Sequence, residues 1–240
     1  MTVTQKLNQI YLRKLVSTPA GRAHVLAQTA DGESSGEARI FKEVLARASD
    51  PELARLVTRH RDDELRHERL FRERLAKTGV AEPELPDELR FVEQLNRALG
   101  GILDRPIHDE RGVLEAYCLL QILEERALLS FGMFIDAFSE VDPETAKVFA
   151  EVLEDERRHL KYCAAVAKRY AASEEQRLEV LARMRGIEAR VFQQNQLRNM
   201  DPTLDRGFLG GQTLAWRLVR RALKLVEATG LAAPAAAQPA

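Results

Sequence analysis

The chain has little that could cross-link it or carry it into a membrane. Its 240 residues include two cysteines, Cys118 and Cys163, too few for a disulfide framework and too far apart for a Cys-x-x-Cys zinc site. Aromatic residues make up 6% of the chain, and no apolar run approaches the roughly 20 residues that span a bilayer. The N-terminal segment MTVTQKLNQIYLRKL lacks the apolar block and cleavage site of a secretory signal. We therefore expect a cytoplasmic protein.

The chain also lacks an excess of charge of either sign. Its 36 Lys and Arg residues nearly balance its 37 Asp and Glu residues, which gives a formal net charge of −1. Without a basic field there is no general attraction for nucleic acid, so we expect no nucleic-acid partner. Hydrophobic residues make up 45% of the sequence, enough in a chain of this length for a substantial core.

The sequence also lacks any sustained alternation of apolar and polar residues, the pattern typical of a half-buried β-strand. Long segments instead place apolar residues at positions i, i+3, i+4 and i+7, which predicts an all-α fold. Proline and glycine divide the pattern into expected helices at 3–16, 19–48, 51–77, 87–99, 112–138, 143–172 and 212–228, with one of about 25 residues after Ser173.

The order of these segments predicts a domain organisation. Two helical hairpins are joined by a long connection at residues 80–111, rich in proline and glycine, and this is the connectivity of ferritin-like four-helix bundles. We expect Asp201-Pro202 to end the helix after the bundle. The expected parts are an N-terminal helix in 1–18, the bundle in 19–172, a C-terminal helical extension in 173–228 and a disordered tail in 229–240.

An internal repeat relates the two hairpins. Adding 92 to a residue number in the first hairpin gives a matching residue in the second. The matched pairs are Glu33 and Glu125, Asp50 and Asp142, Asp63 and Asp155, Glu64 and Glu156, and His67 and His159. One Glu-x-x-His motif arises easily by chance, but two in register with a shared turn and a shared flanking carboxylate do not.

The repeat predicts a site for two metal ions. Glu64 and His67 are three residues apart, so both lie on one helix face, and Glu156 and His159 repeat that geometry. The neighbouring helices would add one carboxylate each. The expected ligands are Glu33, Glu64, His67, Glu125, Glu156 and His159. Four glutamates and two histidines form the ligand set of di-iron and di-manganese carboxylate bundles, and we expect two iron ions, with manganese as the alternative.

Several residues compete for places in this set. Glu37 lies one turn after Glu33 on the same face, although the repeat favours Glu33 because Leu129 stands at the position that matches Glu37. Glu124 competes with Glu125 in the same way. His60 lies one turn before Glu64 and is a candidate extra ligand.

Two aspartates precede the motif glutamates. Asp63 and Asp155 could each accept a hydrogen bond from the histidine of the opposite helix and so fix its tautomer, or they could simply be surface residues.

These motifs resemble those of the ferritin-like superfamily, especially its rubrerythrin-type and small di-iron oxygenase branches. The similarity covers about residues 19–172 and rests on Gly32-Glu33-Ser34, Asp63-Glu64-Leu65-Arg66-His67, Glu125 and Asp155-Glu156-Arg157-Arg158-His159. The resemblance implies a di-iron oxidoreductase that reacts with dioxygen or peroxide. No Cys-x-x-Cys pair is present, so the rubredoxin module of full rubrerythrins is missing and an external electron donor is expected.

Other functions remain open from the sequence. A ferroxidase or peroxide-detoxifying protein would use the same ligands, whereas a metal-free scaffold or membrane-associated adaptor would use none. Residues 206–226 carry five basic residues and no acidic one beside an apolar stripe, a pattern that suits contact with a membrane surface, with another protein, or with the bundle itself. The organic substrate and the oligomeric state stay undetermined.

Overall fold

The computed structural model describes residues 3–35, 37–47, 50–209 and 213–228. These residues form helices joined by turns and loops, and no strand occurs among them, which confirms the predicted all-α fold. In the described part of the chain, no helix combines the length and apolar character needed to cross a membrane. The tail predicted to be disordered, 229–240, lies outside the described residues.

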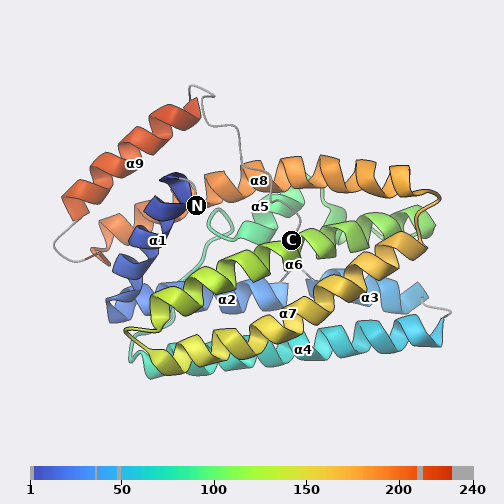
Figure 1. Ribbon diagram of the computed structural model, residues 1–240, viewed down its shortest axis with the longest axis horizontal. Helices are drawn as coiled ribbons and strands as arrows, with labels where there is room; N and C mark the ends of the chain where they lie inside the picture. The colour runs from blue at the N-terminus through green and yellow to red at the C-terminus, as the bar shows by residue number, and fades with distance from the viewer. Residues whose placement is uncertain (1–2, 36, 48–49, 210–212, 229–240) are drawn as a thin grey trace.

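Five helices surround the centre of the molecule. They are α2 (Pro19–Ser35), α3 (Glu37–Arg47), α4 (Pro51–Lys77), α6 (Glu110–Phe138) and α7 (Pro143–Arg169). Helices α2 and α3 follow one another along α4, and α6 packs along α7 (Figure 1). Contacts between α4 and α7 and between α3 and α6 join the group formed by α2, α3 and α4 to the pair formed by α6 and α7.

Matching turns start α4 and α7. The side chain of Asp50 accepts a hydrogen bond from the backbone N–H of Glu52 at 2.9 Å, and Asp142 caps α7 in the same way through Thr145. A proline follows each aspartate, where its missing N–H costs nothing because the first helical N–H groups have no partner within the helix. These caps fix where the two motif-bearing helices begin.

The structure corrects two expected boundaries. The single helix expected over 19–48 is instead two helices, because α2 ends at Ser35 and α3 begins at Glu37. The sequence around this point is rich in glycine and serine, whose low helix propensity weakens a continuous helix. The expected break at Pro202 does not occur, because α8 (Glu174–Asp205) continues through it. Thr203 and Leu204 are buried, and Thr203 bonds to Tyr11, so packing holds this last turn.

The other four α-helices of the described residues cover the central group. Helix α8 lies on α6 and α5 (Phe91–Ala98), on the side of the molecule opposite α4 (Figure 1). Helix α1 (Val3–Val16) contacts α2 and α6, and α9 (Thr213–Ala228) packs on α8. Trp216 of α9 is buried against Tyr11, with ring centroids 5.1 Å apart. The basic C-terminal helix is therefore docked on the rest of the molecule.

The core consists of two apolar clusters separated by a polar layer. On α4, Val57 belongs to one cluster and Phe71 to the other, and on α7, Phe149 and Cys163 are divided in the same way. The histidines and glutamates of the motifs lie between these positions on both helices. Buried polar groups are costly unless they have partners, so this layer requires a physical explanation.

Candidate metal centre

Five helices contribute acidic or histidine side chains to the polar layer. The contributing residues are Glu33 of α2, Glu37 of α3, His60, Glu64 and His67 of α4, Glu124 of α6, and Glu156 and His159 of α7. All are buried except Glu33, whose side chain is 9% exposed. The layer thus holds five glutamates and three histidines, and these include five of the six ligands expected from the repeat.

These side chains form two groups that share one residue. The first group comprises Glu33, Glu64, His67 and Glu156, and the second comprises His60, Glu64, Glu124 and His159. In each group, the potential ligand atoms all lie within 4.8 Å of one another. Bonds of about 2.0–2.2 Å from a metal to oxygen or nitrogen place two ligands of one ion at most about 4.4 Å apart. Each group therefore needs only small adjustments to hold an ion.

Two glutamates lie between the groups. The Oε1 atom of Glu64 is 3.2 Å from Nε2 of His60 and 3.1 Å from Nδ1 of His159. Glu156 places Oε1 at 3.1 Å from Nδ1 of His67 and Oε2 at 3.3 Å from Nδ1 of His159. Both carboxylates are therefore positioned to bridge two ions.

Glu37 reaches the second group from α3. Its Oε2 atom lies 3.4 Å from Nε2 of His60, an atom that is also 2.9 Å from Oε1 of Glu124. Because α2 and α3 are separate helices, each of them directs one glutamate at the layer. Glu33 and Glu37 are consequently both near the centre, one beside each group.

Most of these close contacts are not hydrogen bonds. The atoms left without a hydrogen-bond partner include Oε1 of Glu64, Glu124 and Glu156, Oε2 of Glu37, Nδ1 of His67 and both ring nitrogens of His60. Since buried polar atoms are ordinarily paired, a cluster of unpaired acceptors from several helices fits a bound cation better than an apolar core. The residues present therefore fit a two-metal site.

Two aspartates orient the motif histidines from outside. Asp155 of α7 lies 3.3 Å from Nε2 of His67, and Asp63 of α4 lies 3.2 Å from Nε2 of His159. If each Nε2–H donates to its aspartate, each Nδ1 keeps its lone pair toward the cluster. Arg66 binds the first aspartate, which holds it in place.

Burial and mutual repulsion shift the protonation of the metal-free cluster. Burial, followed by the charge of Glu64, raises the pKa of Glu33 and of Glu37 well above the usual value. Burial alone would lower the pKa of His159, but Glu156 and Glu64 outweigh it and raise that pKa to about 10. The pKa of His67 is raised for the same reason. Metal-free protein therefore holds protons where a metal ion would otherwise supply positive charge.

The structure corrects the expected ligand on α6. Glu125 lies outside both groups, and its carboxylate accepts hydrogen bonds from Arg185 of α8 at 2.6 and 3.1 Å. Adjacent helical residues point about 100° apart, so Glu124 faces the cluster while Glu125 faces α8. The 92-residue repeat matches Glu33 of α2 with Glu125, but the residue of α6 that reaches the cluster is Glu124. The repeat is therefore out of register by one residue at this position. The competing carboxylates in the sequence were the only sign of this.

The pair Glu124 and Glu125 offers a matched test. Glu124→Gln should weaken metal binding by more than the roughly 10-fold that loss of an outer hydrogen-bond partner costs. Glu125→Gln should leave metal content unchanged, because the Glu125 carboxylate binds only Arg185 and the Gln121 side chain, and both lie outside the two groups. Metal titration of both variants measures the difference. Loss of a metal ion in the Glu125 variant alone would restore the ligand set expected from the repeat.

Comparisons with known proteins assign neither a family nor a function to this chain. Neither the models of protein families, nor the curated proteins, nor the solved structures include a match to this chain.

Proposed function

We propose that this chain is a di-iron carboxylate oxidoreductase, built as a ferritin-like four-helix bundle, that activates dioxygen or peroxide. In this proposal α2 with α3, α4, α6 and α7 form the four helical positions of the bundle. The connection from Val80 to Asp109, which includes α5, is the long crossover. The cytoplasmic location inferred from the sequence belongs to the same proposal.

One observation carries the proposal. Buried carboxylate and imidazole atoms from several helices converge in two groups that share Glu64, and most of those atoms have no hydrogen-bond partner. A structural ion-pair network would satisfy these atoms with arginine or lysine, but no such side chain pairs with the cluster carboxylates among the described residues. Arginine side chains instead pair with the two aspartates outside the cluster, Arg66 with Asp155 and Arg158 with Asp63.

The donor atoms suit iron, with manganese as the alternative. Carboxylate oxygen with imidazole nitrogen suits iron or manganese, and the cluster offers no thiolate, because Cys118 and Cys163 are buried in the apolar core. Two Fe(II) ions, when bound, supply the electrons that reduce dioxygen or peroxide.

The side chains of the chain would bind the ions, orient the imidazole ligands and limit the access of water. Glu64 and Glu156 are placed to hold the two ions at a fixed separation, and the imidazoles of His67 and His159 bind as neutral ligands. Asp63 and Asp155 keep those imidazoles in the required tautomer. The apolar clusters on either side limit the access of water to the centre. Electrons for repeated turnover come from an external donor.

The reaction with oxygen tests this function. Protein loaded anaerobically with two equivalents of Fe(II) should consume dioxygen when it is exposed to air, and it should do so faster than free Fe(II) under the same conditions. The double variant His67→Ala/His159→Ala should lose this reaction because it removes a neutral ligand from each group. His108→Ala is the matched control, since His108 is exposed in a loop away from the cluster.

The outcomes separate the candidate functions. Equal oxygen consumption by wild type and the double variant would contradict the proposal and favour a metal-free scaffold. Oxidation of many Fe(II) ions per chain without any organic substrate would instead assign the chain as a ferroxidase.

A further inference from the structure

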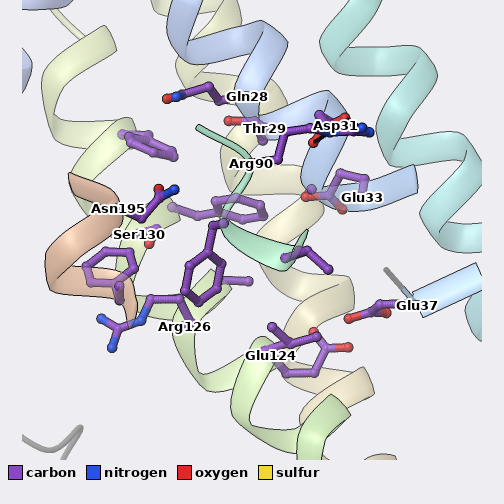
Figure 2. A pocket seen from close by; sticks show the side chains of 18 of the residues that line it. Gln28, Thr29, Asp31, Glu33, Glu37, Arg90, Glu124, Arg126, Ser130 and Asn195 are labelled. Carbon is purple, nitrogen blue, oxygen red and sulfur yellow. Dashed lines mark hydrogen bonds and ion pairs between the residues drawn. The ribbon is translucent and has the colours of Figure 1, made fainter. Parts of the chain in front are cut away.

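A cavity of about 180 Å³ opens beside the candidate metal centre. Figure 2 shows Glu33, Glu37 and Glu124 along one side of it and Arg126 and Asn195 along the other. The bridging glutamates also line the cavity, but no histidine of the cluster is among the described residues that do so. The cavity therefore meets the carboxylate side of the centre, and the histidines occupy the far side.

The charged groups of the outer wall are already paired. Arg126 donates two hydrogen bonds to Glu188 at 2.7 and 3.0 Å, and its guanidinium lies 3.8 Å from the centroid of the Phe192 ring. Arg90 donates to both oxygens of Asp31. An anionic ligand would have to break one of these bidentate pairs, which costs more than the new pair returns. A cationic ligand would compete with the metal ions for the cluster carboxylates that also line the cavity.

The polar groups of the wall are largely committed as well. The Asn195 side chain donates to the Leu89 carbonyl at 3.0 Å and accepts from Asn199 at 2.9 Å. By contrast, the described residues offer no hydrogen-bond partner to the Ser130 hydroxyl, which also faces the cavity (Figure 2). The Gln196 side chain likewise lines the cavity without a partner among these residues, but this residue is exposed and its amide can stay hydrated. A ligand with at most one hydrogen-bonding group fits this wall.

The rest of the lining is aromatic and aliphatic. Four phenylalanines contribute to it, from α5, α6 and α8: Phe91, Phe131, Phe134 and Phe192. Flat rings pack favourably against such a wall through edge-to-face and offset contacts. An apolar cavity of about 150 Å³ is large enough for benzene, so a volume of about 180 Å³ is enough for one ring.

Gly32 keeps part of this space open. It lies inside α2, where glycine costs about 1 kcal/mol relative to alanine. A Cβ added at Gly32 would meet no atom within 4 Å, and the residue lines the cavity. Gly132 and Gly186 have the same open space around them but do not line the cavity, so Gly32 is the position of the three at which a larger side chain would enter it.

We infer that this cavity binds a neutral, single-ring organic molecule with at most one hydrogen-bonding group, next to the metal centre. The inference rests on the proposed function, because it assigns the class of organic substrate on which that centre acts. Ser130 supplies the polar contact, and the phenylalanines hold the ring against the carboxylate side of the cluster.

Simple probes test both the charge and the size of the ligand. Protein loaded with Mn(II) should bind benzyl alcohol saturably in calorimetric titration. Benzenesulfonate and benzylammonium, each with one ring but charged, should bind at least about 10-fold more weakly, as should the two-ring 2-naphthalenemethanol. Equal affinity for a charged probe or for the two-ring probe would overturn the assigned class.

The position of the probe can be measured independently. Paramagnetic Mn(II) should shorten the proton relaxation times of bound benzyl alcohol, and Zn(II)-loaded protein should not. Gly32→Leu and Ala127→Leu fill the cavity from α2 and α6, so each should weaken binding at least about 10-fold and remove the relaxation effect. Gly186→Leu is the matched control: it replaces another helical glycine with open space around it, away from the cavity.

The two proposals fail in different ways. Protein that binds no metal ion contradicts the proposed function. Protein that binds metal ions but neither binds benzyl alcohol nor shows the relaxation effect contradicts the cavity assignment alone. Binding that survives both filling variants places the probe elsewhere and also overturns it.

Discussion

Adding Fe(II) without oxygen should raise the Tm of metal-free protein by roughly 10 °C. Metal that binds only the folded state stabilises it by about 4 kcal/mol when free metal exceeds its dissociation constant a thousandfold. In a chain of 240 residues, each kcal/mol shifts Tm by about 2–4 °C. The gain is large because the ions also neutralise carboxylates that repel one another in the buried layer. Thermal unfolding followed by circular dichroism measures the shift.

The control variants identify the site responsible. Mn(II) should act as a surrogate for Fe(II), and His67→Ala/His159→Ala should remain helical but lose the shift with either ion. His108→Ala should keep the full shift. If metal-free and metal-loaded wild type melt at the same temperature, the glutamates are not gathered in a buried metal site.

The metal-free protein should become less stable as pH rises from about 5 to about 10. Burial and like charges raise the pKa values of Glu33, Glu37 and Glu124, so these carboxyls hold protons in the folded state that the unfolded chain releases near pH 4.5. The raised pKa values of His67 and His159 act in the same direction. Each extra proton on the folded state lowers the unfolding free energy by about 1.4 kcal/mol per pH unit.

Carboxylates whose pKa is lowered in the folded state set the acid limit of the pH range in which the metal-free protein is most stable. The histidines hold the pKa of Glu64 below its usual value, so the stability that this carboxylate contributes is lost as pH falls below about 4.5. Maximum stability without metal is therefore expected at about pH 5–6. Urea unfolding at pH 6, 7.5 and 9 measures the trend. Metal-loaded protein should vary much less between these pH values, and a metal-free protein whose stability rises toward pH 9 would contradict the predicted protonation.

Local signals in the sequence were enough to predict the start of the motif-bearing helices. Asp50-Pro51 and Asp142-Pro143 combine a side-chain cap with a residue suited to the first turn, and α4 and α7 begin there. The spacing of Glu64 and His67, and of Glu156 and His159, predicted that each pair would share a buried face. These features depend on one helix at a time, so the sequence contains them.

Features that depend on two or more helices were harder to predict. Glu125 points away from the layer and binds Arg185, about 60 residues later in the sequence on α8, and this partner cannot be identified from one helix alone. The presence of both Glu33 and Glu37 near the cluster depends on the division of a helix that periodicity treats as continuous. The role of His60 depends on Glu124, which sits beside it only after folding. The identity of the metal ions stays a prediction.

Metal content per chain tests the central claim most directly. Protein expressed without a metal-binding tag in iron-replete medium should contain close to two iron or manganese ions per chain by elemental analysis, because the buried layer has two ligand groups that share Glu64. Less than one equivalent of any transition metal, even after anaerobic incubation with excess Fe(II), would contradict the account.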